Sequence, residues 1–227
     1  MKQLDDINAD LNQHVVVYTE SLQWQSSPSG TVWRKPLYRQ GGEFGPVTSI
    51  VKYDAGGKFR THPHPQGEEI FVLEGEFCDD HGRYPAGTYL LNPDGTEHAP
   101  YSDIGCTLFV RLRQYDGNNR KKLAVNTSDM EWRQGMVEGL TVLPLYSQSE
   151  YPENMALVRW QPDTYFPEHT HPGGEEIFVI EGTFEDDHGE YPTGSWIRSP
   201  HLSKHKPYSK NGCLIYVRVG GLPVHRD

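Results

Sequence analysis

The chain has 227 residues, a formal net charge of −10 and a hydrophobic fraction of 35%. This acidic balance disfavours direct binding to nucleic acid, because the phosphate backbone would be repelled. No stretch offers the roughly 18 apolar residues of a membrane-spanning helix, and no apolar segment follows a basic start as in a secretory leader. We therefore expect a soluble, cytoplasmic protein that binds neither nucleic acid nor membranes.

The residue types favour an all-β protein. Glycine (23) and proline (17) are abundant, and no long stretch places apolar residues at helical spacing. The three cysteines form no CxxC pair, which argues against a disulfide framework and against a thiolate zinc cage. We expect Cys106 and Cys213 to be small buried hydrophobic side chains.

In chain order, the first signals are weak: a short helix around 4–11 or an edge strand at 15–18. Short apolar runs bounded by Gly, Pro and Asp then predict strands. These runs, with their counterparts later in the chain, are 48–53, 70–73, 88–91 and 107–112, followed by 156–160 and 177–180. A hairpin turn is expected at 80–82. The strand lengths suit a closed or sandwich-like barrel.

The chain also contains an internal repeat. Residues 62–75 recur as 169–182, an offset of 169 − 62 = 107. The same offset carries Asp79 to Gly82 onto Asp186 to Gly189, and it holds without insertion through His98 and His205. Strand pairing and turn lengths must be kept together for a barrel to close, so the repeat indicates duplication of a whole folding unit. We expect one domain at 1–115, a polar linker at 116–130 and a second domain at 131–227.

Each repeat carries a set of residues suited to binding a metal ion. Side chains two apart on a strand point to one face, so two histidines in an HxH motif can bind one ion. A glutamate and a later histidine complete each set at identical intervals. The proposed ligands are His62, His64, Glu68 and His98 in the first repeat, and His169, His171, Glu175 and His205 in the second.

Periodicity alone does not choose between adjacent glutamates. Glu68 and Glu69 alternate in parity, as do Glu175 and Glu176, and either face of the strand could line the barrel. Imidazole suits zinc, iron, copper or nickel, and a carboxylate favours a divalent ion. Four protein ligands fit a structural role, and they also leave room for water or substrate on a metal of higher coordination number.

These residues resemble the motifs of the cupin superfamily. Three residues separate His64 from Glu68 and six separate Glu68 from Gly75, while the second motif runs from Gly87 to His98. The resemblance implies a tandem pair of jelly-roll barrels, a bicupin, and it favours Glu68 over Glu69. In the second repeat Leu202 replaces the motif glycine, so that loop is expected to differ.

More narrowly, the runs HPHPQGEEIFVLEG and GCTLFV look like the ChrR-type cupin, the C-terminal domain of a zinc-dependent anti-sigma factor. The resemblance implies two divalent metals per chain, zinc first, with iron, manganese or nickel as alternatives. That anti-sigma factor grips sigma through an N-terminal helical zinc domain with a CxxC pair. Residues 1–45 contain no cysteine, so direct sigma-factor binding is not expected.

Two functions follow as hypotheses. The first is a sensing or regulatory module in which metal and barrel bind a small molecule, and the second is an iron- or manganese-dependent dioxygenase or related enzyme. A purely structural bicupin is the third alternative. No catalytic residue outside the ligand sets can be assigned, and homodimerisation is expected by analogy with other cupins.

Overall fold

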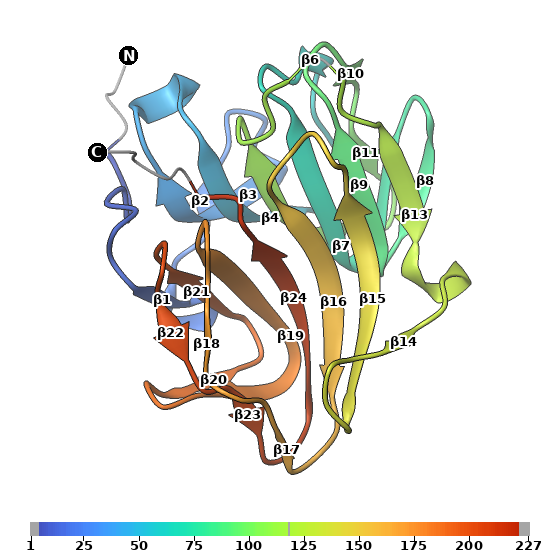
Figure 1. Cartoon of the computed structure of the whole chain (residues 1–227). Helices are drawn as coiled ribbons and strands as arrows, with labels where there is room; N and C mark the ends of the chain where they lie inside the picture. Colours follow the sequence, from blue (N-terminus) through green and yellow to red (C-terminus); the bar gives the residue numbers. More distant parts are fainter. Residues whose placement is uncertain (1–4, 118, 223–227) are drawn as a thin grey trace. The chain divides into compact units, whose positions relative to one another are not determined.

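The computed structural model describes residues 5–117 and 119–222, and these form β-strands with three short 3₁₀ turns (Figure 1). The all-β prediction is therefore confirmed. The chain divides into two compact units: unit 1 is Met1–Ala9 with Leu22–Asp129, and unit 2 is Asp10–Ser21 with Met130–Asp227. The 3₁₀ turns are η1 (Thr19–Ser21), η2 (Gly42–Phe44) and η3 (Thr127–Asp129). No helix in the described part of the chain has the length and apolarity to cross a bilayer.

Unit 1 is built on a main sheet with the strand order β13-β9-β7-β12-β4-β3-β2. Around it, β5 pairs with β11, β8 and β11 pair with β7, and β6 pairs with β10 as a separate two-stranded ribbon. The strands are β2 (Gln25–Ser26), β3 (Val32–Arg39), β4 (Val47–Tyr53), β5 (Gly57–Lys58), β6 (His62–Pro63), β7 (Glu68–Asp79), β8 (Gly82–Pro85), β9 (Thr88–Asn92), β10 (Glu97–His98), β11 (Tyr101–Ser102), β12 (Cys106–Leu112) and β13 (Leu123–Asn126).

Unit 2 repeats this architecture in the order β1-β21-β19-β24-β16-β15-β14, with β18 and β22 as its separate ribbon. Its strands are β1 (Val15–Tyr18), β14 (Arg133–Gln134), β15 (Leu140–Ser147), β16 (Asn154–Trp160), β17 (Thr164–Tyr165), β18 (His169–Thr170), β19 (Glu175–Glu185), β20 (Glu190–Pro192), β21 (Ser195–Ser199), β22 (Lys204–His205), β23 (Tyr208–Ser209) and β24 (Cys213–Val219).

The strands expected from the sequence all form, although most are longer than the apolar runs that predicted them. The run at 70–73 lies in the first half of β7, which continues to Asp79 and passes close to the turn before β12 at Gly75. Gly75 has φ +71, and a Cβ there would lie 2.1 Å from Gly105 O. The helix considered at 4–11 is wrong for the described residues 5–11, which form turns and one isolated bridge. The alternative edge strand at 15–18 is β1.

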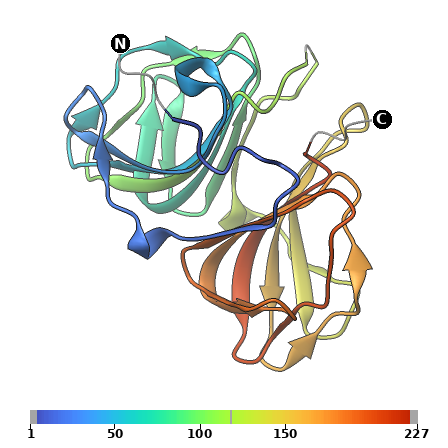
Figure 2. The same ribbon diagram turned by 90° about the vertical axis from the view of Figure 1, so that its left-hand side faces the viewer.

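An exchange of strands relates the two repeats. β1 precedes the first repeat, yet it pairs antiparallel with β21 in unit 2, with Val15 opposite Arg198 (Figure 2). Correspondingly, β13 lies in the segment expected to be a linker and pairs with β9 in unit 1, with Leu123 opposite Leu91. Each unit is therefore completed by a strand that precedes the other repeat in the sequence.

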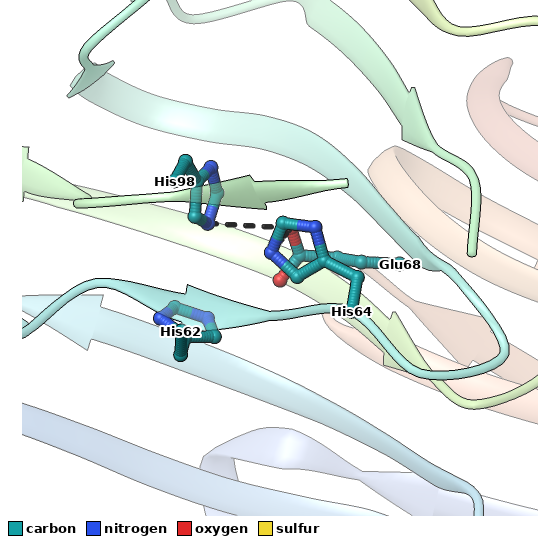
Figure 3. Close-up of side chains that lie close together, drawn as sticks. All are labelled: His62, His64, Glu68 and His98. Atoms are coloured by element: carbon teal, nitrogen blue, oxygen red, sulfur yellow. Dashed lines mark ion pairs between the residues drawn. The ribbon is translucent and has the colours of Figure 1, made fainter. Parts of the chain in front are cut away.

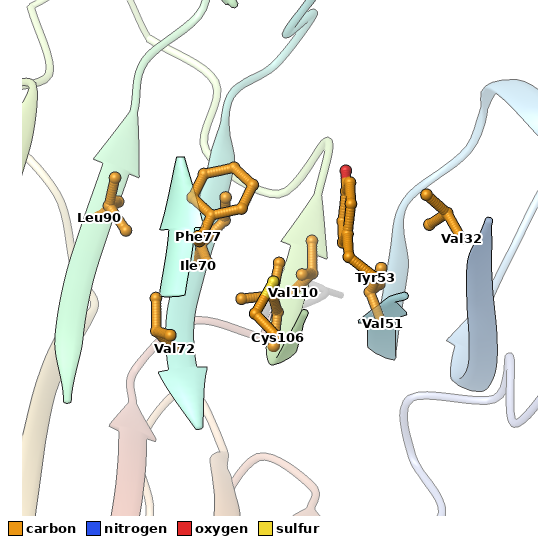
Figure 4. Close-up of a cluster of buried hydrophobic side chains, with 10 residues drawn as sticks. Val32, Val51, Tyr53, Ile70, Val72, Phe77, Leu90, Cys106 and Val110 are labelled. Carbon is orange, nitrogen blue, oxygen red and sulfur yellow. The ribbon is translucent and has the colours of Figure 1, made fainter. Parts of the chain in front are cut away.

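The core of unit 1 lies between its β-strands. Side chains from β3, β4, β7, β9 and β12 meet there, as alternating residues of each strand turn to the same face (Figure 4). The cluster is Val32, Val51, Tyr53, Ile70, Val72, Phe77, Leu90, Cys106, Leu108 and Val110. Unit 2 has the equivalent cluster, with Trp160 at the position of Tyr53. All three cysteines are free and buried, which confirms the prediction for Cys106 and Cys213.

Candidate metal centres

Group 1, defined as His62, His64, Glu68 and His98, comes together within unit 1 (Figure 3). The ribbon of β6 and β10 places His62 directly opposite His98. His64 follows β6 directly, and Glu68 begins β7. His64, Glu68 and His98 are buried, at 3–4% exposure, while His62 is half-buried. One ligand atom from each side chain lies within 4.8 Å of the others.

Group 2, defined as His169, His171, Glu175 and His205, repeats this arrangement in unit 2. His169 pairs with His205 across β18 and β22, and its Nε2 lies 3.1 Å from His171 Nε2. The sequence-predicted residues are thus brought together in both units.

In every histidine of the two groups, the ring nitrogen Nδ1 has a hydrogen-bond partner that fixes the orientation of the ring. The Nδ1 partners are Arg60 O for His62, Thr96 Oγ1 for His64, Asp79 Oδ2 for His98, Pro167 O for His169, Ser203 Oγ for His171 and Asp186 Oδ2 for His205, at 2.9–3.1 Å. Each Nε2 is left as the atom offered to the centre. Metal-binding histidines are oriented in this way by their other nitrogen.

The distances inside the groups fit a single ion. Two atoms bonded to one ion at about 2.1 Å lie roughly 3.0–3.4 Å apart for bond angles between a right angle and a tetrahedral one. Glu68 Oε2 is 3.3 Å from His64 Nε2 and 3.5 Å from His98 Nε2. His64 Nε2 and Glu175 Oε2 are buried and make no hydrogen bond within the described residues. A divalent ion would satisfy both atoms, so the residues fit such an ion.

The structure separates the adjacent glutamates that sequence parity left open. Glu68 faces group 1, whereas Glu69 accepts hydrogen bonds from Arg111 at 3.0 Å and from Tyr115. In unit 2, Glu176 likewise binds Arg218, at 2.9 Å. The outer face of the strand therefore uses its glutamate in a buried ion pair, and the inner face directs its glutamate to the candidate metal site.

Asp79 and Asp186 are supporting residues that sequence reasoning missed, although the duplicated Asp-Asp-His-Gly turn contained the signal. Burial opposes ionisation of Asp79, but its hydrogen bonds with His98 and the His81 backbone N–H hold its pKa at about 2. Tyr84 donates a further hydrogen bond to Asp79, at 3.1 Å. Asp79 is thus a permanent carboxylate that orients His98.

Burial is the first cause of the pKa shifts inside both groups. It lowers the pKa of His64 and of His171 to about 3, and neighbouring histidines add to the effect. It raises the pKa of Glu175 to about 7 and also raises that of Glu68. These imidazoles are therefore neutral at ordinary pH, the form that binds metal, while a metal ion competes with a proton for each buried glutamate.

A cavity of about 60 Å³ adjoins group 1 inside unit 1. Three residues of the group line it, namely His62, Glu68 and His98. Most of the remaining wall comes from apolar core side chains of β3, β4, β7 and β12, with Arg34 and Tyr53 as polar exceptions. The volume has room for a few water molecules or one small ligand beside the candidate metal ligands.

Both repeats match the family model described as the ChrR Cupin-like domain, over residues 12–116 and 120–223. The chain belongs to this family. The cupin fold that the sequence motifs implied is therefore confirmed in two tandem copies. No curated protein sequence matches the chain.

Solved structures share the fold over most of the chain. YlbA from Escherichia coli is 15% identical, with a TM-score of 0.75, and the match covers 100% of this chain and 97% of YlbA. A candidate dioxygenase from Nostoc punctiforme is 14% identical, with a TM-score of 0.76 and coverage of 92% and 82%. Oxalate decarboxylase from Bacillus subtilis, studied for its Mn(II) centres, is 12% identical, with a TM-score of 0.66 and coverage of 92% and 78%. At these identities the likeness shows the fold alone.

Proposed function

We propose that this bicupin binds a small molecule at the metal of group 1, and that this binding serves a sensing or regulatory role. The cavity beside group 1 is the observation that carries the proposal, because a closed structural site needs no such space. A ligand in the cavity would meet His62, Glu68 and His98 directly. Membership of the ChrR cupin-like family supports a regulatory role over a purely structural one.

A metal-dependent enzyme, such as a dioxygenase or a related cupin enzyme, is the second candidate. The same cavity favours it, because a substrate there could reach open positions on a metal held by group 1. The metal would supply Lewis acidity or redox chemistry, and the chain would hold the substrate in place. Proteins of this fold include the candidate dioxygenase and oxalate decarboxylase described above.

The identity of the metal separates the two candidates. Protein purified without added metal is analysed by mass spectrometry, with a double variant His64→Ala and His171→Ala as the control for adventitious binding. Close to two zinc ions per chain would support the regulatory role, because zinc has no redox chemistry. Iron or manganese would support the enzyme. Protein that neither retains nor takes up a divalent ion would contradict both.

Small-molecule binding is tested separately from metal content. The metal-loaded protein is screened against a library of metabolites by thermal shift, beside the His64→Ala variant. Compounds that stabilise the wild type and not the variant support binding at group 1. A library without such compounds would contradict the proposed function.

A further inference from the structure

We propose that the cavity of unit 1 takes a small carboxylate, held by Arg34 and Tyr53 beside group 1. This inference rests on the proposed function and names the class of its ligand. Arg34 and Tyr53 are the two polar side chains of the cavity wall outside group 1. Together they give a mainly apolar cavity one cation and one neutral donor, which is the complement of a carboxylate.

Arg34 lies on β3, is exposed to solvent and also lines the cavity. Its guanidinium carbon lies 5.8 Å from the centre of the Phe59 ring, and Phe59 in turn packs edge-on against His62 at 5.4 Å. In the described chain, no carboxylate pairs with the Arg34 side chain. The cation at this edge of the cavity is therefore available to an incoming anion.

Tyr53 is 7% exposed and stands on β4, with its ring packed against Phe77 at 6.0 Å. Burial raises its pKa, so the phenol stays neutral and can donate a hydrogen bond. The described residues supply no hydrogen-bond partner for its hydroxyl. A ligand oxygen in the cavity would give this buried donor a partner.

Comparison of the two units shows that these polar residues are not needed to build the barrel or the ligand set. Arg34 pairs with Val51 across β3 and β4, and the equivalent pair in unit 2 is Val142 with Val158. Tyr53 has Trp160 as its counterpart. Group 2 keeps its three histidines and its glutamate without the cation or the phenol. Arg34 and Tyr53 are therefore particular to the unit 1 cavity.

The chemistry of the cavity favours a carboxylate over other small ligands. One carboxylate oxygen can meet a metal ion while the other accepts hydrogen bonds from a guanidinium. Apolar walls, including Val51 and Leu108, suit the short carbon chain of an organic acid better than a strongly hydrated phosphate. The metal ion would supply the positive charge for one carboxylate oxygen, so binding is expected only when the metal is present.

The test is isothermal titration calorimetry of the full chain, loaded with the metal that mass spectrometry identifies. The probes are acetate, oxalate and succinate, with acetamide as a neutral control and inorganic phosphate as the competing anion. Arg34→Gln and Arg34→Val, the residue of unit 2, remove the cation, and Tyr53→Phe removes the hydroxyl. Lys35→Gln is the matched control, because it removes the next cation on the same strand, on the opposite face.

At least one carboxylate is expected to bind the wild type, and both Arg34 variants should weaken it by about tenfold or more. The Tyr53 variant should show a smaller loss, and Lys35→Gln should bind like the wild type. Equal affinity in Arg34→Gln and wild type, binding of phosphate alone, or no carboxylate binding would each overturn the inference. The proposed function would survive these results if the metabolite screen found a ligand of another class. It would fail if that screen failed too.

Discussion

The two candidate metal centres both have three histidines and a glutamate, with the same kinds of hydrogen-bond partner at the histidine Nδ1 atoms, but the two glutamates differ in their hydrogen bonds. In unit 1, the Asn92 side-chain amide donates a hydrogen bond to Glu68 Oε2 at 3.0 Å. In unit 2, Ser199 stands at the position of Asn92, and its hydroxyl lies 3.3 Å from His14 Nδ1 instead. Glu175 Oε2 is left without a hydrogen bond in the described chain.

This difference shows that duplicated ligands do not guarantee duplicated chemistry. An amide donor stabilises the ionised carboxylate, and the hydrogen bond from Asn92 lowers the pKa of Glu68 against the effect of burial. Without such a donor, burial raises the pKa of Glu175 to about 7. The residues of the unit 1 cavity wall also differ from their unit 2 counterparts. Arg34 corresponds to Val142, and Tyr53 corresponds to Trp160.

The largest effect is expected when one histidine is removed from either group, in two separate variants. His64→Ala or His171→Ala should each lower the metal content from two ions per chain to one, because the other group keeps its full ligand set. Metal content is measured by mass spectrometry. His81→Ala, which changes a histidine in the turn rather than in a group, should keep both ions. An unchanged stoichiometry in both group variants would refute the ligand assignment.

A smaller effect is expected when the residue that donates to the glutamate of unit 1 is replaced by its counterpart from unit 2. Asn92→Ser removes the amide donor, so the pKa of Glu68 should rise further and protons should compete more strongly with metal for this carboxylate. The metal affinity of unit 1 should fall by about tenfold at pH 6 and by less at pH 8, because a higher pH favours the ionised carboxylate that binds metal.

The measurement is competition with a chelator at the two pH values, in the His171→Ala background so that only group 1 binds metal. An affinity loss of equal size at both pH values would show that Asn92 acts by packing rather than by stabilising the charge on Glu68.

The smallest expected effect concerns the loop that precedes the last histidine. Leu202 has φ +60 and is 59% exposed, while its counterpart Gly95 has φ +84. A leucine in this left-handed region costs about 1 kcal/mol, so Leu202→Gly should stabilise unit 2 by roughly that amount in urea unfolding. Gly95→Ala should destabilise unit 1 through its backbone, because no atom lies within 4 Å of the added Cβ. Unfolding midpoints that stay unchanged would contradict this account.

Much of the fold and of the candidate site could be predicted from local sequence. The repeat, the main strands and both ligand sets follow from residue spacing, because side-chain alternation places His62 and His64 on one face. The loop at Leu202 was expected to differ, yet it keeps the left-handed backbone of Gly95. The choice of Glu68 over Glu69 needed the family motif, since parity within one strand does not say which face is inside.

By itself, then, the sequence determined a duplicated all-β unit with two sets of three histidines and a glutamate. Only the tertiary structure decided that β1 completes unit 2 and β13 completes unit 1, because either short apolar strand could satisfy either sheet edge. It also decided that Asp79 supports His98 and that Arg34 reaches the cavity. These contacts join residues far apart in the chain, and their energies depend on burial and hydrogen bonding that appear only when the barrel closes.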